Sequence, residues 1–223
     1  MIRGNWFVLL GIMVAGNSNA DWDGGIEAGT RLDSGQRNPA LRFFARNQAE
    51  PLSHYLYLDW IRQSGGSNYR IGYNPTFNIS RSVYSFGRFS IEEDDPDGIE
   101  REIDVEVGIG NNLFQRGNTR FKVEVGLGAR QLTFDGIEDT TDEGFFLLAG
   151  TLSTRVLALL RFNASVDTKV GNDQTTLDGE VGVSIPIGPA TSLHYIYSAT
   201  RFELDGQDDL VNEDAFFTIR YGF

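Results

Sequence analysis

Apolar and polar residues alternate at every second position over long stretches of this chain. The clearest stretch is 121–129, which reads Phe-Lys-Val-Glu-Val-Gly-Leu-Gly-Ala. Successive side chains of a β-strand point to opposite faces of the sheet, so the pattern predicts strands with one apolar face and one face of charges and glycines. Lys122 and Glu124 lie in the middle of such a strand, so the two faces of the sheet need different surroundings.

Read with this period, the chain after residue 20 divides into twelve predicted strands, each long enough to cross a bilayer at a tilt, for which about 9 to 11 residues suffice. Their ranges are 24–33, 38–47, 53–62, 67–76, 82–92, 100–110, 119–132, 143–153, 159–170, 174–185, 191–204 and 212–223. The stretch 143–153 has no clean alternation, so ten or fourteen strands also remain open. No apolar run after residue 20 approaches the roughly 20 residues of a spanning helix.

These observations leave a soluble exported β-protein or a closed barrel, which satisfies all its backbone hydrogen bonds in lipid. We predict an all-β fold, a transmembrane antiparallel up-and-down β-barrel of about 12 strands. Cysteine is absent, so disulfide bonds contribute nothing to its stability.

The first 20 residues have the features of a secretory signal peptide. Met1-Ile2-Arg3 precedes the apolar stretch 6–15, and small residues lead up to Ala20. We expect cleavage after Ala20, which leaves residues 21–223 as one barrel domain.

The last predicted strand ends on aromatic and apolar residues that share one face. It resembles the closing strand of bacterial outer-membrane barrels, and we expect it to act as an assembly signal. The residues concerned are Phe217, Ile219, Tyr221 and Phe223.

Acidic residues gather in alternate connections between the predicted strands. If the chain enters from the periplasm, the outward loops include the acidic segments 92–98, 135–143 and 205–209. The intervening turns contain almost no acid; examples are 78–81, 154–158 and 186–190. Acidic loops are ordinarily explained by contact with solvent alone. The alternative is that their carboxylates form a rim that binds divalent cations, which are shared with the phosphates of the lipid. Their spacing matches no EF-hand, and we predict no specific metal site.

A set of charged residues within the predicted strands is expected inside the barrel, because each would cost up to about 2 to 4 kcal/mol on the lipid face near the midplane. Opposite charges on neighbouring strands can pair there. The inward set is Glu27, Arg31, Arg42, Arg46, Arg70, Glu102, Asp104, Glu106, Arg120, Lys122, Glu124, Arg130, Arg161, Asp167, Lys169, Asp178, Glu180 and Arg220. This set indicates either a structural network that fills the lumen or the lining of a narrow, weakly selective channel.

Inward glycines and the aromatic residues permit several interpretations. The glycines at 108, 110, 126, 128 and 182 could accommodate arginine side chains, permit curvature or widen a pore. The aromatic residues favour girdles at the membrane interfaces, with a sugar-binding stripe as the alternative. They are Trp22, Tyr55, Tyr57, Trp60, Tyr69, Tyr73, Tyr84, Phe86, Tyr195, Tyr197, Tyr221 and Phe223.

Catalysis is disfavoured by the sequence. The two histidines are His54 and His194. Ser192 and His194 share a face, but residues two apart in a strand are about 7 Å apart, so we expect no direct hydrogen bond between them. His54 is predicted near the membrane boundary, on the face of Leu56 and Trp60. No nucleophile elbow, phosphate loop or zinc spacing is present.

Four glycine-rich or alternating segments carry a family resemblance: 27–35, 84–90, 107–110 and 124–130. Together they resemble the salt-induced outer-membrane protein family, a domain of unknown function. The resemblance implies an outer-membrane barrel and carries over no catalytic residue.

The leading functional hypothesis is an outer-membrane barrel that acts as a narrow passive channel with a charged lumen. The alternatives are a non-conducting structural or interaction barrel of the envelope, and a barrel lipid hydrolase. The expected partners are outer-membrane lipid, lipopolysaccharide and the barrel-assembly machinery, with the protein as a monomer. A formal net charge of -12 disfavours nucleic acid as a partner, and we expect no cofactor.

Overall fold

The computed structural model describes residues 22–33, 36–62, 66–94, 99–134, 140–157, 159–172, 174–204 and 210–223. The predicted signal peptide, residues 1–20, lies outside this part of the chain. So do residues 95–98, 135–139 and 205–209, which carry much of the predicted acidic rim.

The described chain forms antiparallel strands, most of which begin and end within two residues of the predicted ranges, whereas the strands at 99–116 and 140–157 are longer than predicted. They are β1 (Trp22–Asp33), β2 (Gln36–Asn47), β3 (Leu52–Arg62), β4 (Ser67–Tyr73), β5 (Thr76–Asn78), β6 (Val83–Asp94), β7 (Ile99–Arg116), β8 (Thr119–Phe134), β9 (Thr140–Leu157), β10 (Leu160–Gly171), β11 (Gln174–Pro186), β12 (Thr191–Leu204) and β13 (Leu210–Gly222).

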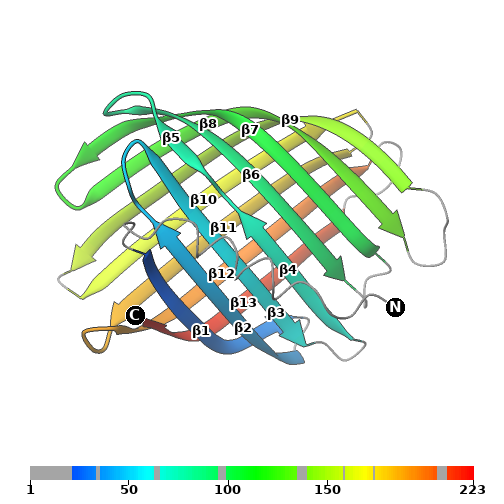
Figure 1. Ribbon diagram of the computed structural model, residues 1–223. Coiled ribbons are helices and arrows are strands. Elements are labelled where there is room, and N and C mark those ends of the chain that lie inside the picture. Colours follow the sequence, from blue (N-terminus) through cyan, green and yellow to red (C-terminus); the bar gives the residue numbers. More distant parts are fainter. Residues whose placement is uncertain are drawn as a thin grey trace.

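The sheet closes on itself (Figure 1). Apart from β4 and β5, which do not pair with each other, strands that are neighbours in sequence pair, and β13 pairs with β1. The short β5 and the longer β4 both lie between β3 and β6, so they form a single interrupted wall strand. The prediction of a closed twelve-stranded barrel is therefore confirmed.

The interruption between β4 and β5 falls at Asn74-Pro75. Proline has no N–H to donate to the ladder, so regular pairing stops there. Asn74 still exchanges backbone hydrogen bonds with Tyr55 of β3, at 2.8 and 3.2 Å, and the Pro75 carbonyl accepts one from Gly87 of β6 at 3.0 Å. The wall stays continuous across the break.

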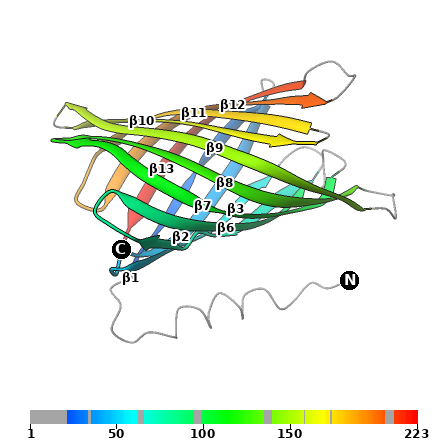
Figure 2. The same ribbon diagram turned by 90° about the horizontal axis from the view of Figure 1, so that it is seen from above.

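Short turns lie at one end of the barrel, which we name the turn end, together with the start of β1 and the end of β13. Gly117, with a positive φ of 58°, makes the tight turn from β7 to β8 there. Figures 1 and 2 show the C-terminal end beside the start of β1, where Gly24 and Phe223 exchange backbone hydrogen bonds at 2.9 Å. The strand ends that flank the acid-rich segments lie at the opposite end, the loop end; they include Glu92 of β6 and Asp142 of β9.

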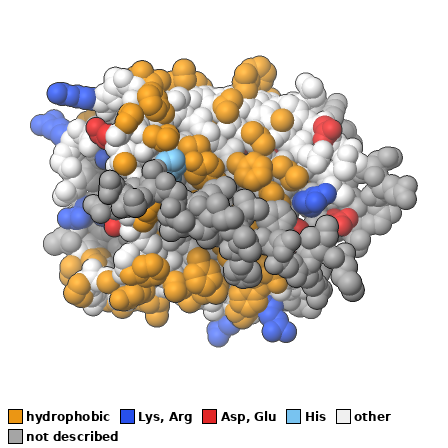
Figure 3. Space-filling model, in the orientation of Figure 1, with side chains coloured by type: hydrophobic (Ala, Val, Ile, Leu, Met, Phe, Trp, Pro, Cys, Tyr) orange, Lys and Arg blue, Asp and Glu red, His pale blue; other side chains and the backbone are white. Residues whose placement is uncertain are grey.

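Apolar side chains cover the outside of the barrel, and charged side chains are buried inside it. Val107, Leu127 and Phe146 are 61%, 55% and 68% exposed, whereas Asp104 and Glu124 are 5% and 4% exposed. Figure 3 shows hydrophobic side chains spread over the visible outer surface. A soluble domain has the reverse arrangement, whereas a membrane barrel has this one. In the described part of the chain, no helix could span a membrane.

The strand without clean alternation, β9, is apolar on both faces. Phe146 and Leu148 are exposed outside, while Phe145, Leu147 and Ala149 are buried inside. The inward Phe145 ring lies against Gly128 of β8, so a side chain at Gly128 would collide with it. The interior is therefore partly apolar at this wall.

The same packing corrects the prediction for several aromatic residues. Tyr84 and Phe86 are not in an interfacial girdle; they are buried with Phe145 and Leu147 in one inward cluster. The Tyr84 ring lies against Gly110, and the Phe86 ring lies against Gly108 and Gly126. These glycines thus accommodate aromatic rings rather than arginine side chains.

Tyr55 and Tyr57 also face inward. The Tyr57 ring lies over Gly72 and beside the Arg42 guanidinium, which is 5.9 Å from its centroid. Other aromatic residues of the predicted girdles are exposed on the outer face: Tyr69, Tyr195, Tyr197, Tyr221 and Phe223.

Candidate functional site

Glu124 of β8 is the best-connected carboxylate inside the barrel. It accepts hydrogen bonds from the Tyr84 hydroxyl at 2.7 Å and from Lys122 Nζ at 3.1 Å. Arg88 of β6 also donates to it, through Nη2. Two cations therefore neutralise this buried charge, and a phenol fills part of its remaining hydrogen-bonding capacity.

Ion pairs continue from Arg88 toward the loop end. Arg88 contacts Glu106 at 3.1 Å, and Lys169 contacts both Glu106 at 2.9 Å and Asp104 at 2.8 Å. Arg130 then pairs with Asp104 at 3.1 Å and Glu102 at 3.0 Å. One chain of contacts thus joins four wall strands: β6, β7, β8 and β10.

Lys169 reaches an unusually distant partner. It lies on β10, yet its partners are on β7, with β8 and β9 between the two strands. Its ammonium passes 5.2 Å from the centroid of the Phe145 ring. The side chain therefore crosses the inner surface of the wall and covers the aromatic cluster.

A second set of ion pairs lines the strands around the closing seam. Arg42 and Asp59 form a bidentate pair at 2.5 and 2.7 Å, and Arg220 contacts Glu27 at 2.6 Å. Thr218 also donates to Glu27. At the loop end of the seam, Arg31 forms a bidentate pair with Asp214. Each of these acidic side chains is thus paired with an arginine.

The wall formed by β10 and β11 differs, because among the described residues its acids form no ion pair. Asp167 and Asp178 lie directly opposite each other in the register, and Glu180 follows on the same face. Asp178 accepts a hydrogen bond from Thr200 at 2.6 Å. Within the described part of the chain, neither Asp167 nor Glu180 takes part in an ion pair.

The residues predicted to line the lumen divide into two groups. One group is ion-paired: Arg42, Arg46, Arg70, Glu102, Asp104, Glu106, Lys122, Glu124, Lys169 and Arg220. The other has no ion pair among the described residues: Arg120, Arg161, Asp167, Asp178 and Glu180. Arg46 and Arg70 belong to the longest of the pairs, at 3.4 Å to Asp23 and 3.6 Å to Glu92.

The sequence prediction missed Arg88 and Asp59, two members of the interior network. Arg88 shares its phase with Tyr84 and Phe86, and Asp59 shares its phase with Tyr55 and Tyr57. Placing those aromatic residues outside would also have placed the charges outside. A charge in the same phase was the signal that the aromatic residues face inward.

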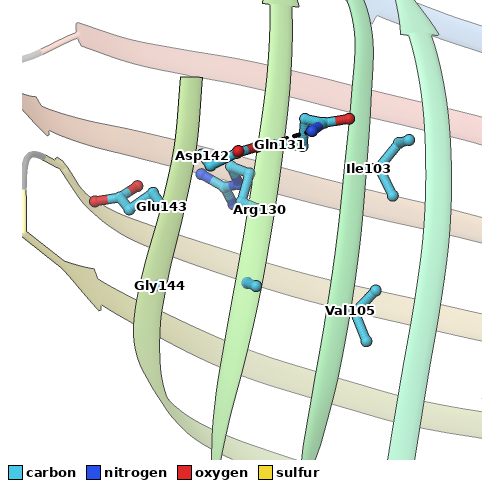
Figure 4. Close-up of a pocket in the computed structure, with 8 residues that line it drawn as sticks. Ile103, Val105, Arg130, Gln131, Asp142, Glu143 and Gly144 are labelled. Atoms are coloured by element: carbon cyan, nitrogen blue, oxygen red, sulfur yellow. Dashed lines mark hydrogen bonds between the residues drawn. The ribbon is translucent and has the colours of Figure 1, made fainter. Parts of the chain in front are cut away.

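Among the described residues, β5 to β9 line a cavity on each side of the barrel wall. The first, about 430 Å³, is lined by residues that include Ile103, Val105 and Ala129, which share the outward phase of β7 and β8 (Figure 4). Gln131 donates to Asp142 across it at 2.8 Å. This cavity is therefore a depression in the outer surface. The second, about 380 Å³, is inside the barrel at the turn end, and Arg120, Lys122 and Glu124 contribute to its lining.

The histidines correct one prediction. Ser192 Oγ and His194 Nε2 are 2.7 Å apart, so the expectation that they could not bond directly was wrong. Their side chains lean toward each other along the strand and close the gap between the backbone positions. Among the described residues no carboxylate hydrogen-bonds to His194, so no triad forms. His54 bonds to the Tyr73 hydroxyl at 2.8 Å and stacks on Trp22.

Comparison with solved structures finds outer-membrane barrels. The NanC porin covers 89% of this chain and 98% of its own, with 10% identity and a TM-score of 0.58. The KdgM porin in complex with disordered oligogalacturonate covers 89% and 99%, with 10% identity and a TM-score of 0.56. A bacterial polysaccharide outer membrane secretin covers 93% and 100%, with 9% identity and a TM-score of 0.53.

The fold thus defines this protein as a porin-like β-barrel of the outer-membrane type. Residues 42–223 match the family described as "Protein of unknown function, DUF481", and the chain belongs to that family. The resemblance to a barrel family of unknown function is confirmed. A search of curated proteins found no match.

Proposed function

We propose that this protein is an outer-membrane barrel that acts as a narrow passive channel for small polar solutes. The observation that carries the proposal is the set of interior charges without ion-pair partners among the described residues: Arg120, Arg161, Asp167 and Glu180. A charge with no partner is stable only where water or a passing ion solvates it. Such residues on the nearby strands β8, β10 and β11 suit a hydrated path along this side of the lumen.

The outer surface supports the proposed location. Phe217, Ile219 and Tyr221 are exposed on the outer face of β13, where lipid tails would cover them. We propose contact with outer-membrane lipid and lipopolysaccharide, recognition of this strand by the barrel-assembly machinery, and a monomeric state. No catalytic step belongs to the proposal.

A second function, a non-conducting structural barrel, is favoured by one specific contact. Lys169 crosses β8 and β9 to reach Asp104 and Glu106, and it reduces the open cross-section beside the aromatic cluster. If the corresponding space on the opposite side is also filled, ions cannot pass.

Single-channel recording in a planar bilayer tests these alternatives. The protein is refolded in detergent, and a heat-modifiable gel band confirms that it is folded. We expect small, reproducible conductance steps that grow in Lys169→Met, because the shorter uncharged side chain opens the lumen. Glu93→Gln, which removes an exposed charge on the outward phase of β6, is the control and leaves the steps unchanged. A folded barrel that stays silent in both forms would refute the channel and favour the structural role.

A further inference from the structure

The interior cavity at the turn end has the size of a small-molecule site. It measures about 380 Å³ and lies between β5, β6, β7, β8 and β9. Ligand sites typically span about 300 to 1,000 Å³. This cavity would hold a molecule of monosaccharide size rather than a long polymer.

The cavity has an excess of positive charge. Its one carboxylate, Glu124, is already neutralised by Lys122 and Arg88. The remaining charge is Arg120, which is exposed to the lumen and has no ion-pair partner among the described residues. A planar guanidinium that is not engaged in an ion pair can bind a carboxylate through two parallel hydrogen bonds.

Neutral hydrogen-bonding groups form the rest of the polar lining. Asn78 and Asn112 supply amides from β5 and β7, and Thr151 and Ser153 supply hydroxyls from β9. Amides and hydroxyls both donate and accept, so they suit the hydroxyl groups of a sugar. Simple inorganic anions would leave most of these groups without a specific partner.

We propose that this cavity binds a small hydroxylated anion, namely a sugar acid whose carboxylate contacts Arg120. The proposal rests on the proposed function in one respect, since the solute must enter the lumen from water. The amides and hydroxyls bind the sugar hydroxyls, while Lys122 beside Arg120 stays paired with Glu124. The acidic wall of β10 and β11 lies outside the lining of this cavity.

The test measures binding to the folded protein in detergent micelles by saturation-transfer NMR. The probes are D-glucuronate and D-glucose, which differ mainly by the carboxylate. We expect glucuronate to bind at least about tenfold more tightly than glucose, because charge-assisted bidentate hydrogen bonds are roughly twice as strong as neutral ones. In Arg120→Gln the preference disappears, and in Arg120→Lys part of it returns.

Arg161→Gln is the matched control. Arg161 is also exposed, inward and without an ion pair among the described residues, but it does not line the cavity. Equal binding of the two probes, no binding of either, or an equal loss in the Arg161 and Arg120 variants would each overturn the site.

A barrel that conducts but binds neither probe refutes this site alone. One that binds glucuronate but stays silent in a bilayer retains the site and refutes the channel.

Discussion

The wall formed by β6 to β9 and the wall formed by β10 to β12 use the same alternation of residues but have different interiors. In the first, aromatic rings lie on glycines and every buried acid of the network has a cation. In the second, Asp167, Asp178 and Glu180 face inward without ion pairs among the described residues. Figure 2 shows β10 to β12 on one side of the barrel and β1, β2 and β6 on the other. The difference teaches that the neighbouring strands determine whether an inward charge closes the lumen or keeps it hydrated.

The largest expected effect comes from removing a shared cation in the packed wall. Arg88→Gln leaves Glu106 and Glu124, whose side chains are each 5% exposed, with one partner fewer. We expect a loss of about 3 to 5 kcal/mol in the free energy of unfolding, the cost of breaking a buried ion pair. Denaturant titration of the barrel in micelles measures it.

Arg46→Gln is the control for that change, because its pair with Asp23 is longer and more exposed. We expect a loss of less than about 1 kcal/mol there. Equal losses in the two variants would show that the packed wall is not held by its ion pairs.

A smaller loss of stability is expected when a methyl group is added to a glycine against which an aromatic ring packs. In Gly108→Ala the new methyl group would meet the Val125 carbonyl, the Gly126 Cα and the Phe86 ring. We expect a cost of about 1 to 3 kcal/mol from overpacking. In Gly182→Ala of β11 the nearest atom is at 3.5 Å, an ordinary contact, so the change stays within about 0.5 kcal/mol. The same unfolding titration compares them, and similar values would remove the distinction between the walls.

The smallest expected effect concerns ion selectivity along the acidic wall. Asp167→Asn and Glu180→Gln remove negative charge from the lumen, so the reversal potential in a potassium chloride gradient moves toward chloride. We expect a change of about twofold or more in the permeability ratio. Glu93→Gln, on the outward phase of β6, serves as the control and leaves the ratio unchanged. An identical shift in the control would mean that net charge, not the acidic wall, determines selectivity.

The strands and the phase of most charges could be predicted from the sequence, because period-two alternation is strong where one face is charged. The alternation did not indicate which side chains face inward where both faces are apolar, as at Phe145 and Phe146. It also misplaced inward aromatic residues that precede a charge, as at Tyr84 and Arg88. The predicted strand 67–76 ran across Pro75 and so missed the break there, which follows from the inability of proline to donate to a ladder.

Contacts between residues far apart in the sequence could not be predicted from this alternation. Lys169 and Asp104 are 65 residues apart and meet across two intervening strands. Their encounter depends on the curvature of the wall and on the glycines beneath the rings. Neither property appears in the alternation of a single strand. The interior cavity likewise depends on the curvature that brings together the inner faces of five strands, β5 to β9.

The seam between β1 and β13 has a consequence for the order of folding. Its ion pairs join residues far apart in the chain: Arg31 with Asp214, and Glu27 with Arg220, separated by 183 and 193 positions. Every other neighbouring pair of wall strands is adjacent in sequence and can form locally, whereas the seam requires loop closure over nearly the whole chain. Closure of the seam is therefore expected to be the slow and final event of folding. Until it occurs, the buried carboxylate of Glu27 has neither Thr218 nor Arg220 to stabilise it.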